Sequence, residues 1–403
     1  MIDIQEIKKA REVLDGVILK TPFTKAPLLS NVCDADIFLK KENLQLTGAY
    51  KIRGAYNKIK NLTDDEKSRG VVAASAGNHA QGVAYSSKIF NIPATIIMPE
   101  ATPLLKVENT KNLGAKVILK GGNYDEAYKE AIKLSCEKNL TFIHPFADDL
   151  VIAGQGTVAL EMLEELQEID YIVVPIGGGG LISGIGSAIK QLSPKTRLIG
   201  VVASGANAMK ISYEKGCPID GKSVRTIADG IAVRDVDKKN FNTICEVVDE
   251  IVEVDDEEIA NAILFLLEKQ KLIVEGGGAV GVAALLHHKF KFEKGSNIAT
   301  ILSGGNIDVQ MLSVIIEKGL IKSNKKLNLM VTLIDKPGSL KKLTDILEEL
   351  NANIIQIDYN RVSATLSFGD AHVTLSLETK NQDHQQDIKN ALNKEGYQHI
   401  QLV

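Results

Sequence analysis

One lysine, Lys51, stands in a setting that could support covalent chemistry. It lies in "QLTGAYKIRGA" (45–55), directly after an aromatic residue, Tyr50, and among small residues. A lysine amine attacks aldehydes and accepts protons once it has lost its own proton. The chain carries 47 Lys and Arg residues, most of which are expected to be solvated cations. A catalytic interpretation of Lys51 therefore needs a ligand that reacts with a lysine, and other segments of the chain must provide the groups that bind this ligand.

A run of four glycines, Gly177–Gly180, predicts a site for an anion. The run follows the apolar segment "YIVVPI" (171–176), and Leu181 opens a helical pattern directly after it. Backbone N–H groups without side chains in the way can converge on a phosphate, and the positive end of the helix dipole adds to the attraction. No Gly-Lys-Ser/Thr follows the run, which excludes a Walker-type loop.

Two further loops supply small polar groups. Between a predicted strand and a predicted helix, "ASAGNHAQG" (74–82) could hold a carboxylate or a polar ring atom through Ser75, Ala76, Asn78 and His79. His79 is interpreted either as a structural hydrogen-bonding residue or as a general base. The segment "LSGGN" (302–306) places Ser303 at the end of another predicted strand, where ligands of α/β sheets bind.

A GxGxxG motif also occurs, formed by Gly276, Gly278 and Gly281. A dinucleotide site would require an acidic residue at the end of the next strand. The next predicted strand, in "NIATILSGGN", has none there, so the motif does not favour a dinucleotide. A ligand with a phosphate, a polar aromatic ring and an aldehyde would use the four-glycine run, both polar loops and Lys51 together. Pyridoxal phosphate is such a ligand.

The composition is that of a globular protein with more than one domain. Its 403 residues exceed one ordinary domain, and a formal net charge of -4 provides no basic footprint for nucleic acid. The four cysteines form no metal-binding motif. The uncharged stretch 171–189 contains Pro175 and six glycines, so it predicts a strand, a loop and a helix rather than a membrane span. The charged N-terminus is not that of a signal peptide, and a cytoplasmic location is expected.

Short β-branched runs that alternate with helical patterns must position these loops. The predicted strands, each apolar on both faces, are 70–75, 93–99, 115–120, 171–176, 197–203 and 297–305. Continuous apolar strands separated by helices are typical of parallel sheets. The predicted fold class is α/β, and the length favours two parallel sheets over one.

The pattern changes near Leu320. The polar and basic segment 321–326 is interpreted as a linker, and residues 327–403 predict a strand, a helix, two strands, a helix and a strand. This βαββαβ order is that of the ferredoxin-like fold. The segment contains His372 but no cluster suited to catalysis, so it is predicted to be a binding or pairing module.

Taken together, the motifs resemble the threonine dehydratases (threonine ammonia-lyases), which are tryptophan-synthase-β-like, fold type II pyridoxal phosphate enzymes. The resemblance covers about residues 1–320 and rests on "KKENLQLTGAYKIRGA", "ASAGNHAQG", "IAGQGTVALE", "VPIGGGGLISG", "TIADGIAV" and "LSGGN". It implies a large lobe at about 1–45 and 145–320 and a small lobe at about 46–144. Residues 327–403 resemble an ACT regulatory domain, with "DKPGSLKKL" at a strand-to-helix turn. A single such domain is similar to the medium-length form of the family.

The resemblance implies a role for each motif. Lys51 would form a Schiff base with pyridoxal phosphate and then remove the α-proton of the substrate. Asn78 would contact the ring hydroxyl and Ser303 the pyridine nitrogen of the cofactor, with Tyr50 packed beside it. The phosphate would be bound by the backbone amides of Gly177, Gly178, Gly179, Gly180 and Leu181. The substrate carboxylate would be held by Ser75, Ala76, Asn78 and His79, and Gly230 and Glu275 would be neighbours of the cofactor. The implied reaction converts L-threonine, and also L-serine, to 2-oxobutanoate or pyruvate and ammonia.

Three departures from related enzymes refine this expectation. Related serine racemases carry a second hydroxyl where this chain has Ala76, so elimination is expected and racemisation is not. Val202 and Asn207 stand where those racemases have carboxylates that hold a divalent cation, so no metal is expected there. Ala49 replaces a commoner serine and is interpreted as a tolerated change.

Several functions stay open on the sequence alone. The same scaffold supports serine dehydratases, racemases and β-replacement synthases, and a non-catalytic amino-acid sensor is a further alternative. The ACT-like segment predicts an amino-acid effector, with isoleucine expected for a biosynthetic enzyme, although a catabolic role is an alternative. Because such domains pair, a homo-oligomer, either a dimer or a tetramer, is expected. Neither a nucleic-acid partner nor a membrane partner is expected.

Overall fold

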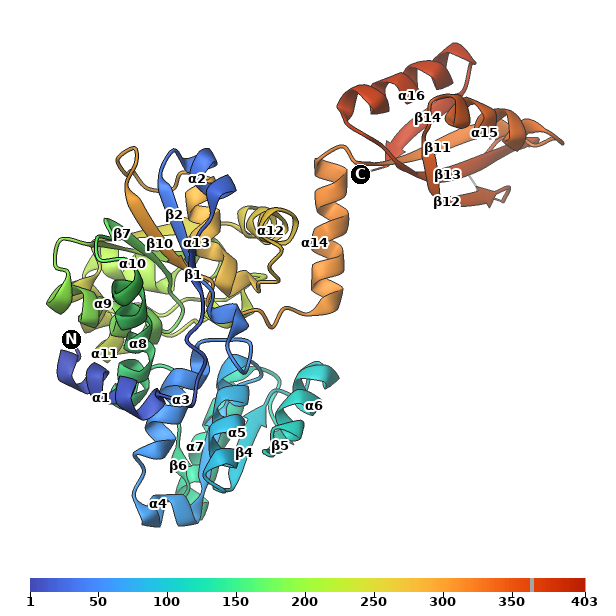
Figure 1. The fold of residues 1–403 in the computed structure, drawn as a ribbon. Coiled ribbons are helices and arrows are strands. Elements are labelled where there is room, and N and C mark those ends of the chain that lie inside the picture. Colours follow the sequence, from blue (N-terminus) through green and yellow to red (C-terminus); the bar gives the residue numbers. More distant parts are fainter. Residues whose placement is uncertain (363–365, 403) are drawn as a thin grey trace. The chain divides into compact units, whose positions relative to one another are not determined.

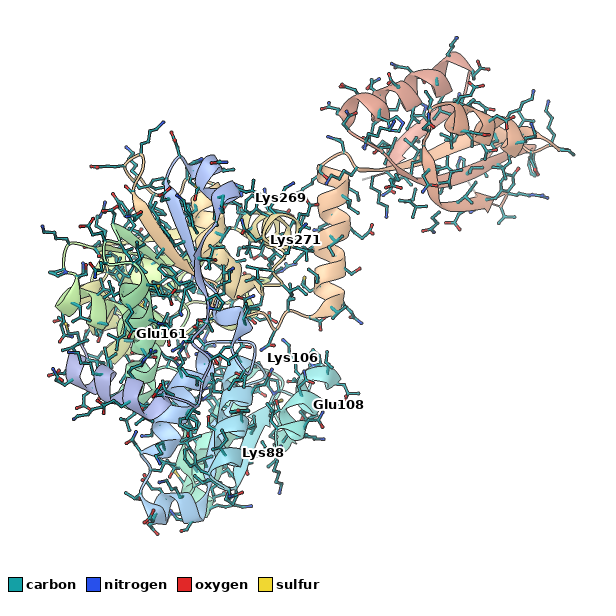
Figure 2. All side chains as sticks on the ribbon, in the orientation of Figure 1. Lys88, Lys106, Glu108, Glu161, Lys269 and Lys271 are labelled. Carbon is teal, nitrogen blue, oxygen red and sulfur yellow. The ribbon has the colours of Figure 1, made fainter. Side chains whose placement is uncertain are left out.

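The computed structural model describes residues 1–362 and 366–402. Figure 1 shows its ribbon and Figure 2 adds the side chains. The chain divides into two compact units, Met1–Asp308 and Val309–Val403. Each unit contains its own cluster of buried apolar residues.

A six-stranded sheet forms the larger part of the first unit. Its strand order is β1-β2-β10-β7-β8-β9, and every neighbouring pair is parallel except the antiparallel pair β1–β2. The strands are β1 (Phe23–Lys25), β2 (Asp36–Lys40), β7 (Tyr171–Pro175), β8 (Arg197–Ala203), β9 (Glu250–Val254) and β10 (Asn297–Ile301). The α-helices that precede and connect them are α1 (Ile4–Leu14), α2 (Pro27–Cys33), α8 (Asp149–Glu165), α9 (Gly180–Leu192), α10 (Ala208–Lys215), α11 (Lys238–Val247), α12 (Asp256–Phe265) and α13 (Gly276–Leu286).

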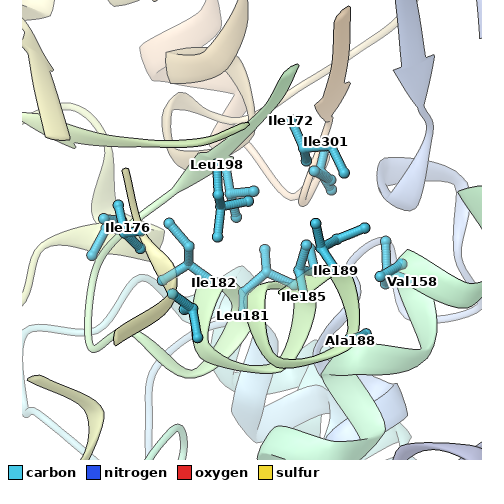
Figure 3. Packing of buried hydrophobic residues seen from close by; sticks show 14 of the residues in the cluster. Val158, Ile172, Ile176, Leu181, Ile182, Ile185, Ala188, Ile189, Leu198 and Ile301 are labelled. Atoms are coloured by element: carbon cyan, nitrogen blue, oxygen red, sulfur yellow. The ribbon is translucent and has the colours of Figure 1, made fainter. Parts of the chain in front are cut away.

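The core of this part lies between the sheet and α9. The apolar side of the helix faces the central strands, as Figure 3 shows for Ile182, Ile185 and Ile189 opposite Ile172 and Leu198. These side chains are fully buried. This packing fixes the start of α9 directly after β7, and the four-glycine run lies at that junction.

A smaller, four-stranded parallel sheet completes the first unit. Its order is β5-β4-β3-β6. The strands are β3 (Val71–Ala74), β4 (Ala94–Met98), β5 (Lys116–Leu119) and β6 (Thr141–Phe142). The α-helices of this part are α3 (Lys51–Lys60), α4 (Asp64–Arg69), α5 (Asn78–Ile89), α6 (Leu104–Asn112) and α7 (Tyr124–Lys138). Across the whole first unit, the short turns of other helical types are η1 (Glu42–Leu44), η2 (Ser204–Ala206), η3 (Asp229–Ile231) and the π-helical η4 (Leu266–Gln270).

The predicted α/β class with two parallel sheets is confirmed. All six predicted strands are present, as β3, β4, β5, β7, β8 and β10. Four strands were not predicted: β1, β2, β6 and β9. Two of them, β1 and β6, are only three and two residues long, and β2 and β9 each contain acidic or basic residues that break the apolar run.

The second unit has the predicted βαββαβ order after one leading helix, α14 (Val309–Lys322). Its antiparallel sheet has the order β12-β13-β11-β14. The elements are β11 (Lys326–Ile334), α15 (Ser339–Glu349), β12 (Asn353–Asn360), β13 (Asp370–Glu378), α16 (Gln382–Lys394) and β14 (Gln398–Leu402). Alternate residues of β11 and β13 are buried against α15 and α16, as expected for a sheet covered on one face. Val403, the last residue of the predicted final strand, lies outside the described residues.

The boundary between the units differs from the expected position. The first unit ends at Asp308, whereas the catalytic domain was expected to extend to residue 320. The segment 309–320 forms most of α14, and this helix also includes the first two residues of the predicted linker 321–326. The amide of Ser323 donates to the Gly319 carbonyl, which continues the turn beyond the helix end. Helical periodicity therefore extends into a segment whose polar composition suggested a linker.

Among the described residues, no helix is both long and apolar enough to span a membrane. The uncharged stretch 171–189 folds as β7, the four-glycine run and most of α9.

Candidate active site

Lys51 is the first residue of α3, at the junction of the two parts of the first unit. The amide of Tyr50, the residue before it, donates to the Ser303 carbonyl at 3.1 Å. Ala49 forms an isolated antiparallel bridge with Gly304. The loop after β10 therefore holds the start of α3, and three predicted site residues, Tyr50, Lys51 and Ser303, are brought together.

The ammonium of Lys51 is part-buried and bonded to the backbone. Its Nζ donates to the Pro145 carbonyl at 2.9 Å and lies 5.3 Å from the centre of the Tyr50 ring. Burial lowers the pKa of Lys51 to about 8, although the Glu275 carboxylate acts in the opposite direction. About a tenth of the amines would then be neutral at pH 7, which is far more than for a solvated lysine. This amine can act as a nucleophile or a base at neutral pH.

The four-glycine run forms a cradle of free amides. Gly179 has φ +85°, a conformation that favours glycine. A Cβ on Gly178 would overlap the Phe146 ring, and a Cβ on Gly177 would lie 2.8 Å from Ile231 Cα. Within the part of the chain that the structure describes, the amides of Gly177–Leu181 donate to no protein acceptor. Free amides at the start of α9 suit a phosphate group.

The loop after β3 turns tightly before α5. The Ser75 amide donates to the Ile97 carbonyl at 3.1 Å, and the Gly77 amide donates to Ser75 Oγ at 3.2 Å. Ala76 contributes no side-chain acid or base. The described residues offer no acceptor to the backbone amides of Ala76, Asn78 and His79, which therefore remain available to an anion.

The side chain of His79 is hydrogen-bonded to the backbone of a neighbouring segment. Its Nε2 lies 2.9 Å from the Ile143 carbonyl, so it carries the proton and donates it there. Burial, followed by the positive charge of Lys51, lowers the pKa of His79 to about 3. A neutral imidazole of such low basicity favours the structural interpretation of His79 over the general-base interpretation.

Asn78 and Glu275 form the polar centre of the site. Asn78 Nδ2 donates to Glu275 Oε1 at 2.7 Å, and Asn78 Oδ1 accepts from Asn306 Nδ2 at 2.8 Å. Burial raises the pKa of Glu275 to about 7. A Cβ on Gly230 would lie 2.9 Å from Glu275 Oε1. Gly230 and Glu275 thus lie beside Asn78, and their expected place as neighbours of the cofactor stays a prediction.

A turn at residues 144–147, which the sequence analysis did not single out, connects Lys51 to the glycine cradle. His144 Nδ1 accepts from the amides of Phe146 and Ala147 at 3.2 and 2.8 Å, and burial lowers its pKa to about 4. The turn presents the Pro145 carbonyl to Lys51. Asn240 Nδ2 donates to the carbonyls of both Phe146 and Gly178, at 2.9 and 2.6 Å. In the sequence, this turn is marked only by the His144-Pro145 pair, which follows the two-residue strand β6.

The GxGxxG motif serves packing. A Cβ on Gly278 would lie 2.6 Å from the Gly304 carbonyl oxygen, and a Cβ on Gly281 would overlap Thr300 Oγ1. The glycines thus allow α13 to approach β10 and the loop that carries Ser303. In dinucleotide-binding folds the third glycine of the motif also allows close packing of a helix against a strand. Here the motif serves this packing and does not form the turn that binds the ligand.

The positions that correspond to a cation site in related racemases carry no carboxylate. Val202 is buried in β8, and Asn207 Nδ2 donates to Glu253 Oε2 at 3.3 Å. Across residues 1–362 and 366–402, no group of three or more His, Cys, Asp or Glu side chains is arranged to hold a metal ion. The expectation of a metal-free site stays a prediction.

Comparisons with known proteins agree with this geometry. Residues 14–304 match the family model described as pyridoxal-phosphate dependent enzyme. The chain is 48% identical to the L-threonine ammonia-lyase of Thermotoga maritima, over 99% of both chains. It is 42% identical to the L-threonine dehydratase catabolic TdcB of Staphylococcus aureus, over 79% of this chain and 93% of that protein. The processed form of threonine deaminase isoform 2 from Solanum lycopersicum is a similar solved structure, with TM-score 0.75, 38% identity and coverage of 78% and 87%.

Proposed function

Because the chain belongs to the pyridoxal-phosphate-dependent enzymes and, among them, to the L-threonine ammonia-lyase family, we propose that it converts L-threonine to 2-oxobutanoate and ammonia. One observation carries the proposal. Lys51 is a part-buried amine with a lowered pKa, and it begins a helix that is bonded to the loop carrying Ser303. L-Serine, which lacks only the methyl group of threonine, is proposed as a second substrate giving pyruvate.

The residues at this site fit pyridoxal phosphate. The free amides of Gly177–Leu181 match its phosphate, and Lys51 Nζ matches its aldehyde. Ser303 Oγ makes only a long bond of 3.3 Å to the Gly277 carbonyl, which leaves it able to bind the ring nitrogen. Asn78 would contact the ring hydroxyl, and Tyr50 would flank the ring. When bound, pyridoxal phosphate withdraws electrons from the α-carbon of the substrate and so makes its proton acidic.

Lys51 would then be the base that accepts the α-proton. A pKa of about 8 keeps a useful fraction of the amine neutral near pH 7. The free amides of the 75–79 loop would hold the substrate carboxylate and so orient the α-hydrogen. Loss of the β-hydroxyl as water gives an enamine, which releases ammonia on hydrolysis and leaves 2-oxobutanoate.

Two residues favour elimination over racemisation. A serine hydroxyl, Ser303, cannot keep the ring nitrogen protonated as a carboxylate would, so negative charge is better carried away by a leaving hydroxyl. Ala76 provides no acid or base to return a proton to the other face of the substrate. Both residues therefore disfavour the second candidate, a serine racemase on the same scaffold.

We propose that the βαββαβ part of the second unit is an ACT domain that binds an amino-acid effector, with isoleucine as the first candidate. Its sheet has an apolar core on one face, formed with α15 and α16, and a mixed polar face on the other. The Thermotoga relative aligns over this part of the chain, whereas the relative named catabolic aligns over a shorter stretch. This difference supports a role in isoleucine biosynthesis. A homo-oligomer, a dimer or tetramer, is part of the same proposal.

The test is release of 2-oxobutanoate from L-threonine by the purified full chain with pyridoxal phosphate, with and without L-isoleucine. Release without isoleucine and suppression with it would support both parts of the proposal. Release that isoleucine leaves unchanged would support the activity and refute isoleucine as effector. In a parallel assay with L-serine, D-serine in place of pyruvate, together with no release of 2-oxobutanoate from L-threonine, would refute the lyase and support the second candidate.

A matched pair of lysine variants assigns the catalytic residue. Lys51→Ala should abolish turnover, because no other described group occupies its position as a base. Lys60→Ala, an exposed lysine on the same helix, should retain turnover. Full activity in Lys51→Ala would contradict the proposed chemistry.

A further inference from the structure

Directly behind the Lys51 helix lies a buried charge network that the proposed chemistry does not use. Four charged side chains, Lys40, Glu42, Arg53 and Glu161, are each fully buried. They belong to β2, η1, α3 and α8, and Glu161 is labelled in Figure 2. The formal charges of these four cancel, and a fifth, part-exposed side chain, Arg11, also donates from Nη1 to Glu161 Oε1 at 2.5 Å. Buried charges are costly unless they are paired, so each contact in this network has a structural consequence.

Arg53 is the centre of the network. Its Nε and Nη2 donate to the two oxygens of Glu42, both at 2.8 Å. Its Nη1 and Nη2 donate to the two oxygens of Glu161, at 2.8 and 2.9 Å. The remaining Nη1 hydrogen is donated to Thr157 Oγ1 at 3.1 Å. All five N–H donors of the guanidinium are therefore used, and this geometry fixes its position and plane.

The carboxylates that bind Arg53 are themselves anchored. Glu42 Oε1 accepts from the Thr21 hydroxyl. Glu161 Oε2 accepts from Lys40 Nζ at 2.6 Å, and the same ammonium donates to the Thr21 carbonyl at 2.6 Å. Burial alone would raise the pKa of Glu161, but Arg53 and Lys40 hold it at about 2, so it is a carboxylate at neutral pH. Arg53 is thus attached to groups that cannot move independently of β2 and α8.

Lys51 and Arg53 lie on opposite sides of α3. Successive residues of an α-helix are rotated by about 100°, so residues two apart differ by about 200°. Lys51 is bonded to Pro145, and Arg53 is bonded to α8 through Glu161. The helices also touch at Gly54 and Gly154, where a Cβ on Gly154 would lie 2.7 Å from Gly54 Cα. The glycine contact sets how closely α3 and α8 approach, but a glycine surface does not set rotation about the helix axis.

We propose that Arg53 is a positioning residue that fixes the rotation of α3 and thereby the location of Lys51 Nζ, with Glu42 and Glu161 as its anchors. The inference rests on the proposed function of Lys51 and adds to it a residue that touches neither substrate nor cofactor. A buried ion network often stabilises a fold no more than apolar residues of the same volume would. The five directional hydrogen bonds that Arg53 donates instead impose a single orientation of α3.

The test measures Lys51 directly in the cofactor-free protein. The pKa of Lys51 is obtained by competitive acetylation with acetic anhydride over a pH series, followed by mass spectrometry of the Lys51 peptide. The variants are Arg53→Lys, which keeps the charge without the fork geometry, and the charge-balanced double variant Arg53→Met, Glu42→Gln. Leu285→Ala is the matched control, because it truncates a fully buried residue at the far end of α13.

The expected result separates positioning from stability. In the natural sequence Lys51 should titrate near 8, and in both Arg53 variants its pKa should rise toward the ordinary value of 10.5, because a rotated α3 exposes the amine to water. Leu285→Ala should lower the melting temperature and leave the Lys51 pKa unchanged. An unchanged pKa in folded Arg53 variants, or an equal rise in the control, would overturn the proposal. Should both Arg53 variants fail to fold, the isosteric Glu42→Gln decides by the same criterion.

The reaction provides a second readout. Arg53→Lys should lower kcat by about tenfold to a hundredfold, because a base displaced by about 1 Å loses that much. KM should stay within about twofold, since Arg53 lies away from the amides that would hold the carboxylate. A normal kcat with a raised KM would contradict positioning of Lys51. If the natural sequence releases no 2-oxobutanoate while Lys51 titrates near 8 and responds to Arg53, the proposed function fails and the positioning role stands.

Discussion

The part-buried carboxyl of Glu275 should make the first unit less stable as pH rises through neutrality. Burial raises its pKa to about 7 from the ordinary 4.5, so the folded protein binds this proton more tightly than the unfolded chain does. For a carboxyl whose folded pKa is raised, the stabilising contribution is complete below pH 4.5. It is lost progressively as the pH rises to about 7 and stays lost above that value.

The magnitude follows from the two pKa values. The difference between 7 and 4.5, at 1.36 kcal/mol per pKa unit, corresponds to about 3 kcal/mol. Since the side chain retains some exposure to solvent, about 2 kcal/mol is the expected loss between pH 4.5 and pH 8. Glu275→Gln removes the ionisation and keeps an oxygen that can accept from Asn78 Nδ2. The variant should therefore gain about 2 kcal/mol relative to the natural sequence over this pH range.

Urea unfolding of the cofactor-free chain at pH 5 and pH 8, followed by circular dichroism, measures this difference. Glu108→Gln is the control, because Glu108 is an exposed carboxylate on α6 (Figure 2). The control should follow the natural sequence at both pH values. Equal stability of Glu275→Gln and the natural sequence at both pH values, or a relative loss for Glu275→Gln at pH 8, would refute the reasoning.

Three other changes test separate parts of the site. Gly178→Ala should weaken pyridoxal phosphate binding at least about tenfold in equilibrium dialysis, because the added methyl group overlaps the Phe146 ring and displaces the free amides; unchanged binding would exclude this loop as the phosphate site. His144→Ala should destabilise the chain by about 1–3 kcal/mol in urea unfolding, since two amides lose their acceptor; His144→Asn, which keeps an acceptor, should recover part of the loss. Glu161→Gln should lower the free energy of unfolding by about 3–5 kcal/mol at pH 7. Because the folded pKa of Glu161 is depressed to about 2, this cost should be complete above pH 4.5 and shrink as the pH falls toward 2; a cost that does not change with pH would contradict the ionic origin.

Of the six strands that the sequence analysis predicted in the first unit, β5 is an edge strand with no buried side chain. The other five are apolar runs that become largely buried within a parallel sheet, and such burial leaves a strong local pattern. The strands that the sequence analysis missed leave a weaker local pattern. β9 (Glu250–Val254) is an edge strand with two acidic residues, and β6 (Thr141–Phe142) is too short to show a period.

Local sequence was sufficient for the parts of the site that depend on backbone conformation. Four consecutive glycines between a predicted strand and a predicted helix indicated a cradle of free amides from composition alone. In the fold, Phe146 and Ile231 occupy the space that side chains at Gly178 and Gly177 would need. Lys51 was recognisable from its neighbours and from the order of the motifs. The sequence by itself thus determined the α/β class and the cofactor type, and it predicts Lys51 as the residue that would carry the cofactor.

Only the tertiary structure decided how the polar residues are used. Whether His79 is a base depended on the Ile143 carbonyl, which lies 64 residues away in the chain, and the partner of Asn78 is 197 residues away. The Arg53 network likewise joins α3 to a helix more than a hundred residues later. Such pairs leave no periodicity in either segment, because each partner is selected by the position of the other in space. Charge, burial and hydrogen bonding at those residues are therefore properties of the folded chain.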